Sequence, residues 1–567
     1  MAPFLLSQKP AMSGLYPCGR GEPATTGCEY FGVEKMPHRL SHRRLLDEKI
    51  QAGIRKHGHK ISKKHRIPIK RLEKAQADLL GNIVVPGDLA YAKVRRIWNV
   101  YFNPRPALII QCEAEKDVRI ALELGREYKI PVTLRSGGHT TAGYSGGTGR
   151  LVIDLKGLND VAIDAEKLTA MVSCGTTFGK MNAALDARGV HLQAGECDDV
   201  RMGGFMQGGG YGFTSRTFGM HCDVVTSFRM MLANGRTVTA SPDVNSDLFW
   251  AVRGGTGGNF GVLLNAAYKI QKLDKVYGWS ILWPLSTAGE RQVAAEAMLA
   301  IQKDFFRTAP PEFNIQIALC YQPTKPGGKA VPQLVVRGLY VGTEEAGKAA
   351  IAPIGRLKGA QFQYDAYEAF ITIDNKLLNY PYDIPYIPFQ KKGQPPEDKQ
   401  ARNVARDLTR DEWQKILDHF VTSPNKWSYL YFEVYGGKIN DYPLEDSAFI
   451  HRDCAFCTAL DIFYYPDDDK KAAEKYLKDW CKLMEPMWNG HIYPNYPKTD
   501  VPDYRKHYWG KALDALIGVK NKYDPDGFFQ FEQVISPYPG EKPKPVSWPP
   551  KVADALKRPI VYEDGKP

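Results

Sequence analysis

Apolar and polar residues follow two different periods along the first part of the chain. The runs "RPALII" and "IPVTL" are short and continuously apolar, which predicts a buried strand at each end of residues 105–134. Between them, apolar residues recur at helical spacing and predict an amphipathic helix: Val118, Ile120, Ala121, Leu122 and Leu124. Residues 151–190 continue with short strands and then a helix that ends at Gly189. Crossover helices between strands predict an α+β fold rather than a helical bundle.

Glycine-rich stretches interrupt this pattern beside three strand-like segments. They are "RSGGHTTAGYSGG" at 135–147, "GECDDVRMGGFMQGGGYGFTSRTFG" at 195–219 and "FWAVRGGTGGNFGV" at 249–262. Glycine lets the backbone approach a ligand closely, so these loops predict N–H groups along an extended ligand that carries phosphates. His139 is either a turn residue or a group aimed at that ligand. Neither the order of a Rossmann site nor the Gly-Lys-Ser/Thr ending of a Walker loop is present.

The residue composition and pattern of the chain change at about Asp274. Glycine loops become rarer, and "AGERQVAAEAMLAIQKDFF" and "PQLVVRGLYVG" predict a helix and a strand of an inserted domain. A glycine-containing loop like those of the first part occurs again in "VKNKYDPDGFFQFEQVI". The predicted organisation is a basic extension at 1–78, a ligand-binding domain at 79–273, an inserted domain at 274–492, a return to the first domain at 493–540 and a tail at 541–567.

The net charge of +12 is concentrated near the N-terminus. Residues 36–74 hold 13 Lys and Arg against three acids. No aromatic residues interleave the core of this run, "RKHGHKISKKHRIPIKR", which favours a solvated basic arm over a nucleic-acid surface. We therefore predict no nucleic acid as the main partner.

The ten cysteines are thinly spread and do not form a disulfide framework. Cys454 and Cys457 make a C-x-x-C without a second pair, inside "DCAFCTALDIFYY", which reads as a strand, so no metal site is predicted. No apolar run is long enough to span a membrane, and the apolar start of "MAPFLLSQKPAMSG" is too short for a secretory signal. Localisation and oligomeric state stay open.

Seven motifs stand in order between Pro86 and Pro537. They are "RSGGHTTAGYS", "GGGYGFTSRTFGM", "DLFWAVRGGTGGNFGV", "YGGKIN", "FIHRD", "YPNYPKTD" and "VKNKYDPDGFF". Together they resemble the FAD-linked oxidases of the berberine bridge enzyme-like group, which share the vanillyl-alcohol-oxidase fold. The resemblance implies a PCMH-type FAD-binding domain made of the N-terminal region plus the C-terminal return. It also implies an inserted substrate domain with an antiparallel sheet backed by helices.

The resemblance implies FAD held by two covalent bonds. His139 occupies the position that is linked to the flavin 8α-methyl group, and Cys197 of "GEC" the position linked to flavin C6, with a free buried thiol as the alternative for Cys197. The other residues implied to bind the cofactor are Arg135, Ser136, Gly137, Gly138, Thr140, Ser145, Val200, Gly203, Gly204, Gly208, Gly209, Gly210, Gly212, Gly261, Val262, Tyr493 and Asn495.

Three places depart from the family pattern. After the cysteine the family usually reads Pro-Thr-Val-Gly, where this chain has Asp198, Asp199, Val200 and Arg201. Phe205 stands where the family often has histidine, and Ala512 where it commonly has asparagine. These departures predict a retuned flavin or a narrowed pocket rather than a different cofactor.

Alcohol oxidation needs a base for the hydroxyl proton, and the resemblance supplies candidates. Tyr496 of "YPNY" matches the family's base, Glu433 before "YGG" matches an orienting carboxylate, and Tyr211 matches another active-site tyrosine. Tyrosine has a pKa near 10 and needs a partner that takes up or stabilises the proton. Val200 matches a position where valine admits oxygen and leucine tends to block it.

These features predict an FAD-dependent oxidase that acts on an alcohol carbon and passes electrons to O₂, giving H₂O₂. "YGGKIN", "FIHRD" and "YPNY" favour a sugar or oligosaccharide as the substrate. Oxidation of an alkaloid or polyketide intermediate and dehydrogenation of an aromatic alcohol remain as alternatives. A flavin-binding protein without turnover is the alternative outside the enzymes.

Overall fold

Strands and helices alternate in the first part of the chain, as the apolar pattern predicts. The computed structural model describes residue 50 and residues 52–323, 328–379, 395–465 and 470–565. A four-stranded sheet has the order β1 (Asn82–Val84), β2 (Leu108–Gln111), β4 (Leu151–Asp154), β3 (Val132–Arg135), with β4 parallel to both of its neighbours. Helix α5 (Glu115–Glu127) connects β2 to β3 and buries Val118, Ala121, Leu122 and Leu124, which confirms the predicted amphipathic helix.

A second sheet completes the N-terminal half. Its order is β5 (Val161–Asp164), β6 (Thr169–Ser173), β10 (Val262–Lys269), β8 (Val225–Met231), β9 (Thr237–Ala240), and all of its pairs are antiparallel. Helices α6 (Phe178–Asp186), α7 (Met202–Gln207), α8 (Ser215–Phe218) and α9 (Ser246–Val252) lie in the connections between its strands, and β7 (Val190–His191) pairs with β11 (Gln271–Lys272). Thr177 caps α6 by accepting from the Lys180 N–H, which fixes where that helix begins.

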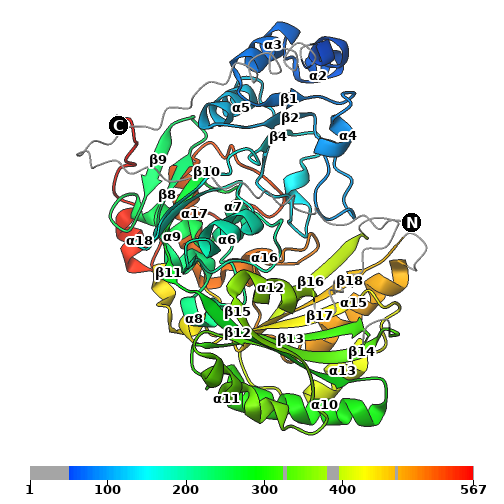
Figure 1. The fold of residues 1–567 in the computed structure, drawn as a ribbon. Helices are drawn as coiled ribbons and strands as arrows, with labels where there is room; N and C mark the ends of the chain where they lie inside the picture. Colours follow the sequence, from blue (N-terminus) through cyan, green and yellow to red (C-terminus); the bar gives the residue numbers. More distant parts are fainter. Residues whose placement is uncertain (1–49, 51, 324–327, 380–394, 466–469, 566–567) are drawn as a thin grey trace, which may run out of the picture. The chain divides into compact units, whose positions relative to one another are not determined.

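The inserted region is built on a seven-stranded antiparallel sheet. Its order is β15 (Gln361–Ala369), β12 (Lys275–Pro284), β14 (Val331–Tyr340), β13 (Phe313–Gln322), β17 (Tyr429–Val434), β18 (Phe456–Phe463), β16 (Glu397–Val404). One face is covered by α10 (Ala288–Ile301), α11 (Glu344–Gly355), α13 (Arg410–Phe420) and α15 (Lys470–Met484) (Figure 1). The other face packs against the core of the first two sheets. The sheet lies within the predicted 274–492 segment, whose exact boundaries stay a prediction.

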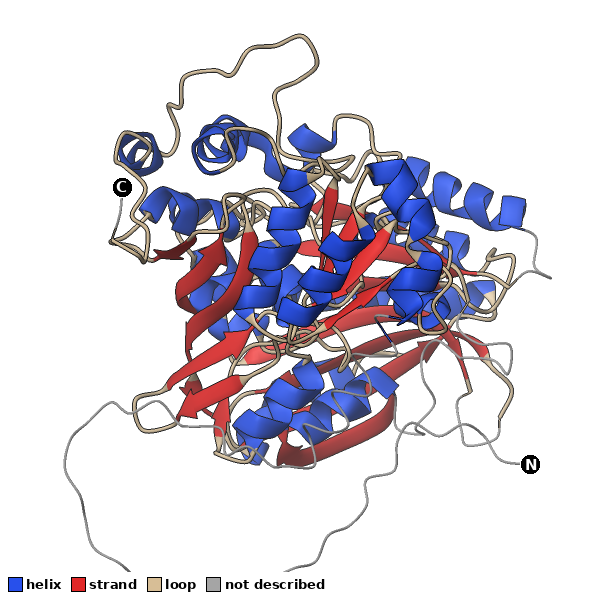
Figure 2. Ribbon diagram, turned by 90° about the horizontal axis from the view of Figure 1, so that it is seen from above, coloured by secondary structure: helices blue, strands red, loops and turns tan. Residues whose placement is uncertain are grey.

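The C-terminal segment returns to the first sheets, as the motifs indicate. Helices α16 (Tyr504–Trp509), α17 (Leu513–Tyr523) and α18 (Pro550–Ala555) follow β18 and α15, and α17 and α18 both pack on α9. Figure 2 shows helices on both sides of the strands. Beyond residue 540 the tail is also attached, since Glu563 forms an ion pair with Arg229 of β8.

The basic segment is more structured than a solvated arm. Ile61 of helix α2 (His59–His65) and Leu72 of helix α3 (Ile69–Asp78) are buried in the same core as β1 and β2, together with Ile54 before α2 and Ile67 between the two helices. Lys63, Lys64, Lys70 and Lys74 are exposed, so their charge faces solvent while the apolar positions anchor the helices. Residues 1–49 of the predicted extension lie outside the described residues.

Candidate active site

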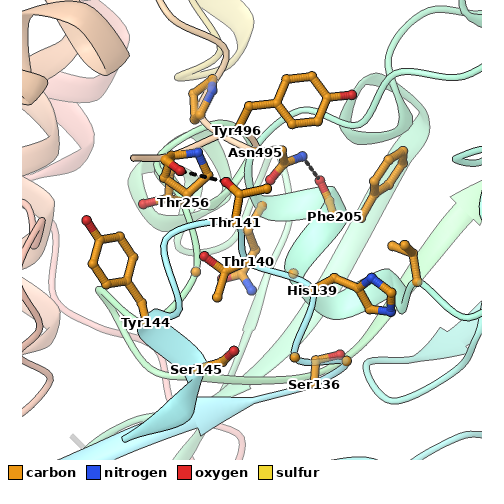
Figure 3. Close-up of a pocket in the computed structure, with 18 of the residues that line it drawn as sticks. Ser136, His139, Thr140, Thr141, Tyr144, Ser145, Phe205, Thr256, Asn495 and Tyr496 are labelled. Atoms are coloured by element: carbon orange, nitrogen blue, oxygen red, sulfur yellow. Dashed lines mark hydrogen bonds between the residues drawn. The ribbon is translucent and has the colours of Figure 1, made fainter. Parts of the chain in front are cut away.

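A cavity of about 390 Å³ lies between the glycine loops, the C-terminal return and the inner face of the seven-stranded sheet. The loop after β3 supplies Ser136 to Ser145, the segment 195–211 supplies its second wall, and "YPNY" supplies the third. Figure 3 shows His139, Thr140, Tyr144 and Ser145 along one stretch of this wall, with Asn495 and Tyr496 across from it. Segments far apart in sequence therefore meet where the motifs predict one site.

The polar atoms of the β3–β4 loop fit a large polar cofactor. Thr140 Oγ1, Tyr144 Oη and Ser145 Oγ are buried, line the cavity and lack hydrogen-bond partners within the described chain. Buried hydroxyls are normally satisfied, so these three are suited to a ligand with phosphate or ribityl oxygens. The backbone is open as well, because a Cβ at Gly204 would meet nothing within 4 Å. These residues fit FAD.

His139 and Cys197 both line this cavity. His139 Nε2 lies 3.3 Å from Asp199 Oδ2, and its ring lies 5.6 Å from the ring of Trp98. Burial opposes ionisation of Asp199, but the hydrogen bond and charge of His139 outweigh it and lower the pKa of Asp199. Burial, reinforced by Glu196 and Asp199, raises the pKa of the Cys197 thiol, which is free.

The segment after Cys197 departs from the family pattern without closing the cavity. Val200 and Arg201 line it, and Arg201 donates to the Gly175 carbonyl. Asp198 and Asp199 are exposed and do not line it, so of the two acids and the arginine only Arg201 reaches the cavity wall. The carbonyl of Phe205 accepts from Asn495 Nδ2 at 2.9 Å, and the Phe205 ring makes an edge-to-face contact with the Phe178 ring.

The structure separates the predicted cofactor residues into two groups. Those that line the cavity are Ser136, Gly137, Gly138, His139, Thr140, Ser145, Cys197, Val200, Gly203, Gly204, Tyr493 and Asn495. Those that do not are Arg135, Gly208, Gly209, Gly210, Gly212, Gly261 and Val262. Arg135 is fully buried outside the lining, and its guanidinium pairs with Asp154 at 2.7 Å and so joins β3 to β4.

The glycines outside the lining permit close backbone packing behind the cavity. A Cβ at Gly208 would lie 2.2 Å from Asn495 Oδ1, and one at Gly212 would lie 1.8 Å from the Ala194 carbonyl oxygen. The N–H groups of Gly210 and Tyr211 donate to Tyr493 Oη at 2.9 and 3.1 Å. These glycines thus fix the "YPNY" segment from behind, which the motif order alone did not reveal.

Tyr496 and Glu433, which the resemblance predicts to act together, are hydrogen-bonded to each other. Tyr496 Oη donates to Glu433 Oε1, joining the C-terminal return to strand β17. Burial raises the pKa of Glu433 to about 8, and burial together with the Glu433 charge raises the pKa of Tyr496 well above 10. Tyr211 also lines the cavity, but its hydroxyl points to the Val434 carbonyl at 3.4 Å.

Sequence reasoning missed a charged group on the sheet side of the cavity. Glu397 and Lys399 of β16 and Asp461 of β18 line it, together with Tyr429 and Tyr431 of β17. Lys399 Nζ lies 3.1 Å from Asp461 Oδ2. Because side chains alternate between the two faces of a strand, the sequence indicates which residues of one strand share a face. Only the pairing of Lys399 with Asp461, and of Asp461 with Tyr429, brings the three strands' residues together.

Family models match both parts of the site. The model described as FAD binding domain matches residues 106–241, and the model described as Berberine and berberine like matches residues 492–536. The chain is 27% identical to an uncharacterized FAD-linked oxidoreductase, YvdP, of Bacillus subtilis, covering 81% of this chain and 98% of the relative. It is also 27% identical to a carbohydrate oxidase of Microdochium nivale, covering 80% and 92%.

A solved structure has the same fold. The xylooligosaccharide oxidase of Myceliophthora thermophila in complex with xylobiose superposes with a TM-score of 0.71 at 23% identity, covering 82% of this chain and 98% of that chain. Taken together, the fold and the site define an FAD-binding oxidoreductase. The chain contains an FAD binding domain and a berberine-like segment and has the PCMH-type FAD-binding fold, which confirms the resemblance and the α+β prediction.

Two further observations concern metals and membranes. Within the described residues, no group of three or more His, Cys, Asp or Glu is placed to hold a metal ion. No described helix has the length and apolar character to cross a membrane. Cys454 and Cys457 lie buried as free thiols at and next to the start of β18, which confirms the strand interpretation of that motif.

Proposed function

We propose that this protein oxidises an alcohol carbon of a sugar or oligosaccharide, most specifically the anomeric carbon, and passes the electrons to O₂ to give H₂O₂. The observation that carries the proposal is the Tyr496–Glu433 hydrogen bond in the wall of the FAD cavity. Bound FAD supplies the hydride acceptor for the alcohol carbon. His139 and Cys197 would hold FAD covalently, and the unpaired hydroxyls of Thr140, Tyr144 and Ser145 would bind its polar part.

The chain's own contribution to the chemistry is to move the hydroxyl proton. Tyr496 accepts the proton of the substrate hydroxyl at Oη, while its own proton passes to Oε1 of Glu433. Tyrosine alone is a poor base near neutral pH, and Glu433 with a pKa of about 8 is a proton acceptor that the site does provide. Tyr493 is held by Gly210, Tyr211 and Asn495 and keeps the segment rigid.

The sheet side of the cavity favours a hydroxyl-rich substrate over a flat aromatic one. Glu433, Asp461 and Lys399 offer charged donors and acceptors, and Tyr429 and Tyr431 offer ring faces beside them. A carbohydrate oxidase among the relatives supports the same choice. A peroxide-release screen over glucose, cellobiose, xylobiose and aromatic alcohols tests the proposal. Peroxide from an aromatic alcohol alone would favour an oxidase of aromatic alcohols. If none of these compounds gives peroxide, a flavin-binding protein without turnover is favoured.

The double covalent attachment predicts that FAD stays with the denatured polypeptide. His139→Ala and Cys197→Ala should each leave one bond, and the double variant should release FAD into the supernatant. The measurement is the flavin absorption of acid-precipitated protein against its supernatant. If Cys197→Ala leaves the absorption spectrum and reduction potential identical to those of the parent, Cys197 is only a buried thiol.

Val200 is expected to keep the oxygen path open. Val200 lines the cavity three residues after Cys197, and Val200→Leu adds a methylene there. Reoxidation of the reduced enzyme by O₂ should slow, while anaerobic reduction by substrate stays near the parent rate. Rapid-mixing measurements of the two half-reactions separate these effects. Equal slowing of both would show that Val200 shapes the substrate pocket instead.

A further inference from the structure

The ammonium of Lys399 lies over the ring of the predicted base. Lys399 Nζ is 4.1 Å from the centroid of the Tyr496 ring and 5.1 Å from that of Tyr431. Asp461 Oδ2 lies 3.1 Å and Glu397 Oε1 3.7 Å from the same nitrogen. A cation within about 6 Å of a ring face is attracted by it, more strongly when the pair is shielded from water. The Lys399 side chain is only 9% exposed.

The sheet register fixes this geometry. Lys399 of β16 pairs with Asp461 of β18, which pairs in turn with Tyr429 of β17. Two residues further along, Tyr431 pairs with Ala459. A buried ammonium persists only with partners, and Asp461 and Glu397 supply them without contacting Tyr496 in any recorded hydrogen bond.

Acids and tyrosines otherwise surround the Tyr496–Glu433 pair. Glu433 is faced by Glu196 from the loop before Cys197 and by Asp461 from β18, and burial and both acids favour its protonated form. Burial and the charge of Glu433 raise the pKa of four neighbouring groups, which therefore stay neutral beside it: Tyr211, Tyr493, Tyr435 and Cys457. Lys399 acts in the opposite direction and favours the ionised carboxylate. Its own charge is retained because Asp461 and Glu397 raise the pKa of Lys399.

We propose that Lys399 is a positioning residue for the base: its ammonium, held by Asp461 and Glu397, orients the Tyr496 ring and favours the anionic form of the Tyr496–Glu433 pair, which is the form that accepts the substrate proton. This rests on the proposed alcohol oxidation for its catalytic meaning. The electrostatic part concerns the folded protein alone. Tyr496 then gains the proton of the substrate hydroxyl and gives its own to Glu433, so the pair beneath Lys399 loses its negative charge.

The electrostatic part is tested without substrate by a double-mutant cycle on the FAD-loaded protein. A carboxyl whose pKa is higher in the folded than in the unfolded chain stabilises the fold fully below the unfolded pKa, and that contribution is lost as pH rises through the folded pKa. The stability difference between parent and Glu433→Gln should therefore fall from about pH 4.5 and level off near pH 8. Lys399 lowers the pKa of Glu433, so in the Lys399→Met background the stability difference caused by Glu433→Gln should level off about one pH unit higher.

The comparison separates a positioning role from a structural one. A lysine that only holds strands together would lower stability at every pH and leave unchanged the pH at which the Glu433→Gln stability difference levels off. The proposal is overturned if this difference follows the same pH curve with Lys399 and with Met at that position. Lys498→Met is the matched control, because Lys498 pairs with Asp398 at 2.5 Å and makes no cation–π contact within the described residues. It should leave the levelling point where it is in the parent. Lys399→Gln replaces Lys399→Met if the latter does not fold.

The catalytic part uses xylobiose as the probe. Anaerobic bleaching of the flavin should reach half of its maximal rate about one pH unit higher in Lys399→Met than in the parent. A shifted stability curve without any bleaching by xylobiose would contradict the proposed substrate and leave the role of Lys399 in place. Bleaching by xylobiose with unshifted profiles would contradict the role of Lys399 and leave the proposed function in place.

Discussion

Tyr496→Phe is expected to lower the rate of flavin reduction about 10²–10⁴-fold while folding and FAD content stay unchanged. The change removes only the phenolic oxygen, which donates to Glu433 Oε1 and is the atom that would receive the substrate proton. The Tyr496 ring keeps its edge contact with Tyr493 and its place beneath Lys399. The loss should therefore appear in anaerobic flavin bleaching and not in thermal stability.

Two comparison variants make this result specific. Tyr211→Phe should cost less, because the Tyr211 hydroxyl points to the Val434 carbonyl rather than to Glu433. Glu433→Gln should lower the rate less than Tyr496→Phe and should remove the rise in rate that the parent shows as pH approaches about 8. If Tyr496→Phe reduces flavin at nearly the parent rate while Tyr211→Phe abolishes reduction, the base is assigned to the wrong tyrosine.

Gly210→Ala is expected to destabilise the protein by about 3 kcal/mol or more, since strain at positive φ and overpacking each cost ~1–3 kcal/mol. Gly210 has a φ of 92°, and a Cβ there would lie 2.4 Å from the Phe205 ring and 2.7 Å from the His221 Cβ. Its N–H also donates to Tyr493 Oη, so displacement of this segment loosens the "YPNY" wall. Denaturant unfolding and FAD content measure the effect.

Gly289→Ala is the matched control for this substitution. Gly289 lies in the first turn of α10, and a Cβ there meets nothing within 4 Å. Alanine is favoured over glycine in a helix by up to ~1 kcal/mol, so this variant should be neutral or slightly more stable. Equal stability of both variants would contradict the assigned packing role of Gly210.

The local pattern predicts the elements well where period and burial agree. The α5 helix and the β18 strand both follow from apolar spacing, because each buries a continuous face. The charge of residues 54–78 alone suggests a free solvated arm. In the structure, isoleucines spaced among the lysines are buried in the core and anchor this segment, while its lysines from Lys63 onward are exposed. Apolar residues within a charged run are the sign that distinguishes such helices from a free arm.

The sequence predicts the site residues that lie in motifs and misses those that do not. His139, Cys197, Tyr496 and Glu433 meet in one cavity because each sits in a recognisable motif. Arg135 belongs to the same motif as His139, yet its side chain pairs with Asp154, and motif membership does not indicate side-chain direction. Lys399 carries no motif at all, and its place depends on the pairing of β16 with β18 across a sheet that local sequence does not specify.

The most direct test of the account is to mix the oxidised enzyme with xylobiose without oxygen and then to admit air. The account predicts that the visible flavin absorption bleaches, that air restores it, and that one H₂O₂ appears for each alcohol oxidised. Tyr496→Phe should slow the bleaching and leave the return in air unchanged. The account is contradicted if neither xylobiose nor other sugars bleach the flavin while an aromatic alcohol does, or if the bleached enzyme does not regain its colour in air.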